Sequence, residues 1–220
     1  MTDISPEQQR QLIENLADQL RRDDPDTRVI ETHISSVILS GDRAYKIKKP
    51  LDLGFLDFST RDKRRFFCEE ELRLNSRLAP GLYRAVQPIT GTIEAPVIGG
   101  SGEALDHAVE MERFDQSAQL DRQLAEGALP LEYMDRIAER VADFHERAAV
   151  ADADSDFGTP ATVKVPMVQN FEQLRELVSD ADILARVDQV EEWSLKLHQR
   201  LKPRLEARKR GGFIRECHGD

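Results

Sequence analysis

One stretch sets the fold of the first half of the chain: Val29-Ile30-Glu31-Thr32-His33-Ile34-Ser35-Ser36-Val37-Ile38-Leu39-Ser40-Gly41-Asp42-Arg43-Ala44-Tyr45-Lys46-Ile47-Lys48. Its short runs of β-branched and other apolar residues predict three strands, at 29–32, 37–39 and 44–48. Gly41-Asp42 suits a two-residue hairpin turn, because the first position of such a turn needs a positive φ. We therefore expect an antiparallel sheet to begin here.

The third of these strands has two lysines on one face. Because side chains alternate along a strand, Ala44, Lys46 and Lys48 share a face, and Tyr45 and Ile47 share the other. A small residue two positions before a lysine suits a nucleotide site, since alanine leaves room for a flat base and the ammonium reaches the phosphates. Taken alone, the strand favours the alternative, an edge strand whose lysines face water.

A helix is predicted before the sheet. Ser5 serves as N-cap, Pro6 takes the first helical position, and Gln8 completes a capping box. This helix carries one apolar stripe, which we expect to pack on the sheet, made of Leu12, Ile13, Leu16 and Leu20. After the third strand comes an apolar connector, residues 51–58, which we expect to be tucked against the protein.

The helix after the connector is expected to carry a buried carboxylate. Ser59 or Thr60 caps it, and it runs to about residue 78. Of three consecutive glutamates, Glu71 alone shares a helical face with Cys68 on the side expected to be buried. A carboxylate there needs a partner, and a lysine of the third strand is the natural one.

The β pattern returns and then stops. Strands are predicted at 83–89, 93–98 and 107–114, and helical periodicity takes over beyond Phe114. We therefore predict an α+β chain with a lobe boundary near Phe114. Residues 1–114 would form an antiparallel-sheet lobe with its two helices, and residues 115–220 a helical lobe.

Three helical features are predicted in the second half. An amphipathic helix follows Leu131, and residues 149–166 form a loop. Asn170 and Gln173 read as a capping box that starts another helix. A long helix then covers about 182–210, with Trp193 facing inward.

The last segment, Gly211-Gly212-Phe213-Ile214-Arg215-Glu216-Cys217-His218-Gly219-Asp220, is a second candidate for function. A short apolar run that ends in His-Gly-Asp is typical of a strand that delivers a carboxylate to a cleft. His218 would orient the loop and Asp220 would accept a proton. The alternative is a surface turn, which three residues alone favour.

Composition narrows the class of protein. The chain has 220 residues and a net charge of −10, which argues against a dedicated binder of nucleic acid or anionic membranes. No apolar run reaches membrane-spanning length and the first residues lack a signal-peptide pattern, so we expect a cytoplasmic protein. Cys68 and Cys217 are too few for a disulfide framework and are expected to act as small buried hydrophobes.

Five separated segments resemble a known family, in the same order and spacing. They are Thr32-His33-Ile34-Ser35, Ala44-Tyr45-Lys46-Ile47-Lys48-Lys49-Pro50, Gly54-Phe55-Leu56-Asp57-Phe58-Ser59, Glu71-Leu72-Arg73-Leu74-Asn75 and Arg215-Glu216-Cys217-His218-Gly219-Asp220. The chain resembles the aminoglycoside phosphotransferase-like branch of the protein-kinase-like superfamily. It is most similar to the N-terminal domain of bacterial proteins that fuse such a domain to a P-loop kinase.

This resemblance implies a two-lobed, protein-kinase-like fold whose helical C-lobe is incomplete. It implies an ATP-dependent phosphotransferase that acts on a hydroxyl of an unidentified small molecule, with a P-loop kinase domain in the full-length protein. The cofactors implied are ATP and Mg²⁺. The alternatives are a non-catalytic nucleotide-binding or regulatory module, and an α+β interaction protein in which Lys46, Glu71 and Asp220 never meet.

The resemblance also assigns roles to residues. Lys46 would clamp the phosphates and Glu71 would hold Lys46, with Lys48 as a rival for the clamping role. Ala44 would face the base, backbone groups around Glu110 and Met111 would bind adenine, and Asp220 would be the base, beside His218. The remaining implied residues, which stand in for an absent Gly-rich loop, are Ser35 and Ser36.

One departure from the family pattern affects activity. The asparagine and aspartate that hold the metal in the family are expected after Asp220, and the sequence stops there. We therefore expect the 220-residue chain to be inactive as a phosphotransferase.

Overall fold

The computed structural model describes residues 3–217. The chain divides into two compact units, Met1–Leu131 and Glu132–Asp220. The first combines helices with a six-stranded sheet and the second is helical, so the predicted α+β class is confirmed. Strand structure ends at Glu112, close to the position predicted for the change from strand to helix.

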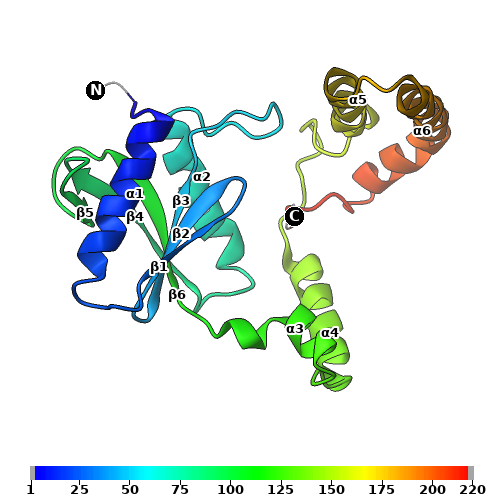
Figure 1. Cartoon of the computed structure of the whole chain (residues 1–220). Coiled ribbons are helices and arrows are strands. Elements are labelled where there is room, and N and C mark those ends of the chain that lie inside the picture. Colours follow the sequence, from blue (N-terminus) through cyan, green and yellow to red (C-terminus); the bar gives the residue numbers. More distant parts are fainter. Residues whose placement is uncertain (1–2, 218–220) are drawn as a thin grey trace. The chain divides into compact units, whose positions relative to one another are not determined.

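The first unit begins with a helix and a three-stranded hairpin series (Figure 1). Its elements, in chain order, are α1 (Pro6–Leu20), β1 (Arg28–Glu31), β2 (Ser35–Ser40), β3 (Arg43–Lys48), α2 (Arg61–Asn75), β4 (Tyr83–Gly91), β5 (Pro96–Ile98), β6 (Asp106–Glu112), a 3-10 turn (Gln116–Ala118) and α3 (Leu120–Ala125).

The six strands form one antiparallel sheet in the order β1-β2-β3-β6-β4-β5. The first three strands are sequential neighbours, and Gly41 in the β2–β3 turn has the predicted positive φ, 55°. Strand β6 inserts between β3 and β4, which places β3 inside the sheet. The interpretation of β3 as an edge strand is therefore wrong.

Helix α1 covers one face of this sheet. The predicted capping box is present, with the Ser5 hydroxyl accepting from the Gln8 N–H and the Gln8 side chain accepting from the Ser5 N–H. Burial of the apolar stripe on the sheet drives the packing. The resulting core combines four residues of α1 with one residue from each of four strands, and it consists of Leu12, Ile13, Leu16, Ala17, Ile38, Ile47, Ile89 and Ala108.

The connector between β3 and α2 differs from its prediction. It is a hairpin in which the Phe58 N–H donates to the Leu51 carbonyl at 2.7 Å and Gly54 takes a φ of 79°. Phe58 at its base is buried, whereas Phe55 near its tip is 73% exposed. The expectation that the connector is tucked against the protein holds for its base only.

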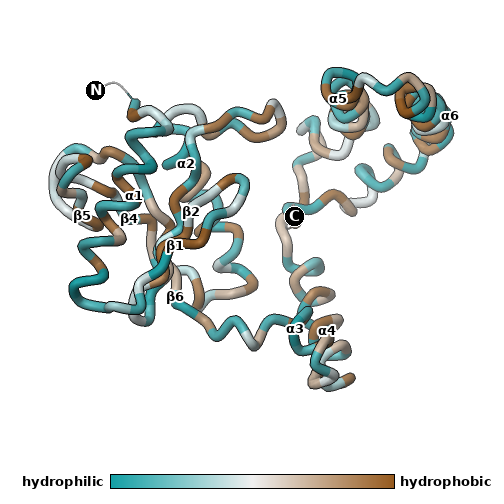
Figure 2. Tube along the Cα trace, in the orientation of Figure 1, coloured by the Kyte–Doolittle hydropathy of each residue, from teal (hydrophilic) through white to brown (hydrophobic). Residues whose placement is uncertain are grey.

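The second unit contains α4 (Glu132–Arg147), α5 (Pro160–Leu177) and α6 (Ala181–Arg210). Helix α5 starts at a Thr159 cap with Pro160 in its first turn, so the predicted start at Asn170 is wrong and the predicted loop ends earlier. Trp193 of α6 is 62% exposed, which contradicts its predicted inward position. Figure 2 shows hydrophobic and hydrophilic residues mixed along these helices.

The segment after α6 is only partly strand-like. Residues 213–217 make one isolated antiparallel bridge, between Arg215 and Val150, instead of a ladder. The Arg215 guanidinium also donates to the carbonyls of Glu146 and Ala148, at 2.9 and 3.0 Å. These contacts tie the end of the described chain to the last turn of α4 and the segment after it.

Candidate functional site

The site is built around one glutamate and two lysines. Glu71 lies on the face of α2 that is turned toward the sheet, and its carboxylate contacts both lysines of β3. Lys46 Nζ is 2.8 Å from Oε1, and Lys48 Nζ is 2.6 Å from Oε2. The predicted contact between Lys46 and Glu71 is confirmed, and Glu71 also contacts the rival lysine.

The electrostatics of Glu71 follow from these partners. Burial acts to raise the pKa of the carboxyl group, but the positive charges of Lys48 and Lys46 and their hydrogen bonds outweigh it. The pKa of Glu71 is therefore below its ordinary value of 4.5. With two ammonium groups and one carboxylate, the cluster carries a net positive charge at neutral pH.

The two lysines have different surroundings. The Lys48 side chain is 7% exposed, and its Nζ lies 4.9 Å from the centre of the Phe58 ring, a cation–π contact. The Lys46 side chain is 28% exposed, and Glu71 is its one polar partner within residues 3–217. Lys46 therefore has the more solvent-exposed side chain of the two.

Three other predicted residues lie on the lysine face of the sheet. Ala44 of β3 is buried and pairs across strands with Met111 of β6. Directly paired residues of neighbouring strands point to the same face, so both belong to the face of Lys46. Ser35 pairs with Lys48, and its buried hydroxyl has no hydrogen-bond partner in the described part of the chain.

The structure does not bring Ser36 or Glu110 to the lysines. Ser36 pairs with Ile47, whose side chain belongs to the core beneath α1. The Glu110 carboxylate contacts Arg43 Nε at 3.2 Å, on that same opposite face. The main chain of Glu110 and Met111 lies in β6. This strand pairs with β3 on one side and with β4 on the other, so it is not a free edge of the sheet.

His218 and Asp220 lie outside the described residues, so their predicted roles stay predictions. Within residues 3–217, no group of three or more His, Cys, Asp or Glu side chains is arranged to hold a metal ion.

The sequence analysis missed a buried ion pair on α2, about two helical turns before Glu71. Arg64 of α2 and Asp106 of β6 are both 0% exposed, with Nε and Oδ1 2.9 Å apart. Gln9 of α1 donates to Asp106 at 2.6 Å and to the Lys48 carbonyl at 2.8 Å. The signal was present, since Arg64 precedes Cys68 and Glu71 at helical spacing on one face of α2.

Cys68 lies between these two ion pairs on α2 and is buried. Burial raises the pKa of its thiol to about 12. The thiol is therefore not nucleophilic at neutral pH, in agreement with the prediction of a small buried hydrophobe.

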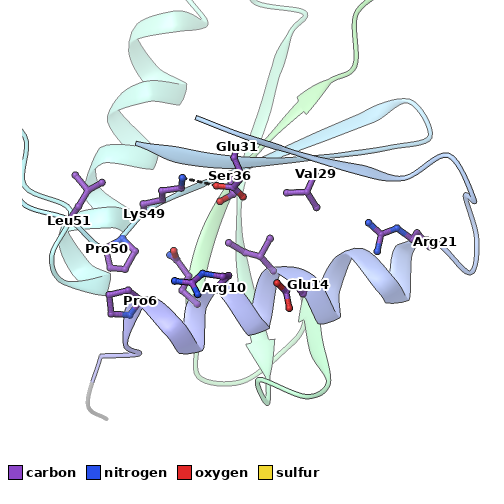
Figure 3. Close-up of a pocket in the computed structure, with 12 residues that line it drawn as sticks. Pro6, Arg10, Glu14, Arg21, Val29, Glu31, Ser36, Lys49, Pro50 and Leu51 are labelled. Atoms are coloured by element: carbon purple, nitrogen blue, oxygen red, sulfur yellow. Dashed lines mark ion pairs between the residues drawn. The ribbon is translucent and has the colours of Figure 1, made fainter. Parts of the chain in front are cut away.

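A cavity of about 660 Å³ lies on the other face of the sheet (Figure 3). Figure 3 shows Arg10 and Glu14 of α1 opposite Val29 of β1 and Ser36 of β2, and Lys49 paired with Glu31 in the lining. Because Ser36 and Lys46 project from opposite faces, this cavity is separate from the Glu71 cluster.

Comparison with curated proteins identifies mycobacterial relatives. Over 170 residues the chain is 34% identical to the uncharacterized proteins Mb2027c of Mycobacterium bovis and Rv2004c of Mycobacterium tuberculosis. The match covers 76% of this chain and 32% of each relative, so the chain spans about a third of the length of these relatives. No family model matches the chain, and no solved structure matches it significantly.

Across residues 3–217, no helix has both the length and the apolar character needed to cross a bilayer.

Proposed function

We propose that the sheet unit is the nucleotide-binding part of an ATP-dependent phosphotransferase of the kinase-like class, acting on a small-molecule hydroxyl. The observation that carries the proposal is the 2.8 Å ion pair between Lys46 on the third strand and Glu71 on the helix that follows. Protein kinases place a lysine and a glutamate on the corresponding strand and helix, and the pair must be formed for phosphoryl transfer.

The chemistry of such a site is positioning and charge neutralisation, with no covalent step on the protein. Lys46 would bind the phosphates, and the small side chain of Ala44 would leave room for a base on the same face. The net positive charge of the cluster favours a polyanion. Mg²⁺, when bound with ATP, would neutralise further phosphate charge.

The second candidate is a non-catalytic nucleotide-binding or regulatory module. It is supported by the same ion pair, which could hold the phosphates of a nucleotide without any transfer step. Both candidates require nucleotide binding at Lys46. Phosphate transfer by this 220-residue chain would exclude the module and contradict the expectation of inactivity.

The test is thermal unfolding of the chain with and without ATP or ADP. A ligand that binds only the folded state raises the unfolding temperature, and at a hundredfold excess over Kd the gain is about 2.7 kcal/mol. We expect stabilisation of the wild type and its loss in Lys46→Met. The matched control is Lys49→Met, because Lys49 is a neighbouring lysine of similar exposure that pairs with Glu31 at the separate cavity.

An equal response of Lys46→Met and the wild type would contradict nucleotide binding at this cluster. An absence of stabilisation in the wild type, at nucleotide concentrations far above ordinary cellular levels, would contradict both candidates. The interaction-protein alternative would then remain.

A further inference from the structure

The cavity between α1 and the outer strands is large for a gap in side-chain packing. Among residues 3–217, the buried core beneath α1 takes one residue from each of β2, β3, β4 and β6, whereas Val29 of β1 is only partly buried. The helix therefore closes less tightly on the β1 side of the sheet, where the cavity has a volume of about 660 Å³. Protein interiors have few voids larger than a water molecule, and ligand pockets measure roughly 300–1,000 Å³. The size of this cavity suits a small molecule.

Apolar side chains form much of the cavity wall. They come from α1, from β1 and from the segment after β3, and they are Pro6, Ile13, Val29, Pro50 and Leu51. Burial of apolar surface against such a wall is favourable for the ligand as well as for the protein. The wall therefore favours a ligand with an apolar body over a bare ion.

Ser36 places a hydroxyl group on the sheet side of the cavity. The residue is 2% exposed and lines the cavity, and its side chain has no hydrogen-bond partner within residues 3–217. Buried polar side chains are hydrogen-bonded in the large majority of cases, because an unsatisfied hydroxyl costs free energy. A ligand in the cavity with its own polar group would supply the missing partner.

Glu14 adds a negative charge on the helix side of the cavity. Each cation of the lining already has a carboxylate partner, in the pairs Arg10–Glu7, Arg21–Asp18 and Lys49–Glu31. Glu14 has no ion-pair or hydrogen-bond partner in the described part of the chain. Figure 3 shows Glu14 on α1, across the cavity from Ser36 on the sheet. The charge left without a partner is therefore negative, which complements a cationic group.

We propose that this cavity binds a small amphipathic amine, with an apolar or aromatic body between an ammonium group and a second polar group. The ammonium group pairs with Glu14, the body contacts the apolar wall, and the second polar group hydrogen-bonds to Ser36. The proposal is independent of nucleotide binding, because Ser36 and Lys46 project from opposite faces of the sheet.

Tyramine, which has an amine, an aromatic ring and a hydroxyl group, is a suitable probe. Its binding to the 220-residue chain is measured by NMR titration and compared with three analogues. Phenethylamine lacks the hydroxyl group, tyrosol has a hydroxyl group in place of the amine, and hydroxyphenylpropanoate carries a carboxylate there. We expect tyramine to bind most tightly and the carboxylate about tenfold more weakly, because Glu14 attracts the first and repels the second.

Variants of the two polar residues test each contact separately. Ser36→Ala should weaken tyramine binding about threefold to tenfold, the loss of one hydrogen bond, and leave phenethylamine binding unchanged. Glu14→Gln should weaken tyramine binding about twofold to fivefold and leave tyrosol binding unchanged. Glu69→Gln is the matched control, because Glu69 is an exposed carboxylate on α2 and outside the cavity lining, and it should bind tyramine as the wild type does.

The location of the ligand is tested by filling the cavity. Val29→Trp adds bulk from β1, at the edge of the sheet, and should abolish tyramine binding. If this variant does not fold, the methyl signals of Ile13 and Val29 in the wild type decide the location instead, since both should shift when tyramine is added.

Three results would overturn the proposal. Equal affinity for tyramine and the carboxylate analogue, or equal weakening of tyramine and tyrosol by Glu14→Gln, would exclude an amine as the ligand class. Tyramine binding that persists in folded Val29→Trp, or that leaves both methyl signals unmoved, would exclude the cavity as the site. A wild type that binds none of the four probes up to their solubility limits would exclude both.

Discussion

At the scale of single residues, Glu71 links stability to pH. Its pKa is lowered in the folded protein, so the unfolded chain takes up a proton first as the pH falls. The stability due to its ionisation is present above 4.5 and is lost as the pH falls through the lowered folded pKa. We expect Glu71→Gln to cost about 3 kcal/mol of unfolding free energy at neutral pH, because Lys48 remains buried without a carboxylate.

Urea unfolding of wild type and Glu71→Gln over a series of pH values measures this. The difference between the two proteins should be largest at neutral pH and shrink below 4.5. Glu69→Gln is the control: Glu69 forms an exposed pair with Arg65 on the same helix, and its loss should cost about 0.5 kcal/mol or less. A difference between wild type and Glu71→Gln that stays constant with pH would contradict the prediction.

At the scale of elements, α2 is fastened to the sheet at two points. Arg64 pairs with Asp106 near its start, and Glu71 pairs with β3 two turns later. We expect Arg64→Met to destabilise the protein by about 3–5 kcal/mol, because it leaves the Asp106 carboxylate buried without its cation. Arg64→Met with Asp106→Leu should be less destabilising than Arg64→Met alone, since no charge is then stranded.

A double-mutant cycle from urea unfolding checks this coupling. Arg65→Met is the matched control, as the same substitution one position along α2 at an exposed ion pair. Additive effects of Arg64→Met and Asp106→Leu would show that the two side chains do not act as a pair. A loss in Arg65→Met as large as that in Arg64→Met would show that helix propensity, and not the buried pair, is responsible.

At the scale of the whole molecule, the two units differ in how much core they bury. The sheet unit has a cluster of fully buried side chains, whereas in the described part of the second unit the buried hydrophobic residues are Ala148 and Phe171. Local opening is easier where few apolar contacts must be broken. We expect amide hydrogens of β3 and β6 to exchange far more slowly than those of α4, α5 and α6.

Hydrogen exchange followed by mass spectrometry measures this directly on the whole chain. Protection in the second unit equal to that of β3 would contradict the expected difference. The first turn of α1, where Pro6, Glu7 and Gln8 are exposed, provides an internal reference for fast exchange within the stable unit.

Much of the sheet unit could be predicted because its signals are local. The Ser5 capping box, the glycine turn at Gly41 and the alternation along β3 each depend on residues close in sequence. The second unit was predicted less well. An amphipathic pattern identifies the apolar side of a helix but does not show whether another element covers that side. For this reason the pattern predicted an inward Trp193, although the side chain is exposed.

Two placements could be predicted from the sequence alone: Lys46 and Lys48 share a strand face, and Glu71 lies on the buried face of the next helix. These placements follow from the periods of strand and helix, which are properties of the local backbone. The difference in exposure between the two lysines depends instead on contacts between distant parts of the chain. Residues two apart on a strand have the same local pattern, and what separates these two is the Phe58 ring and a hydrogen bond from Gln9, 39 positions away from Lys48.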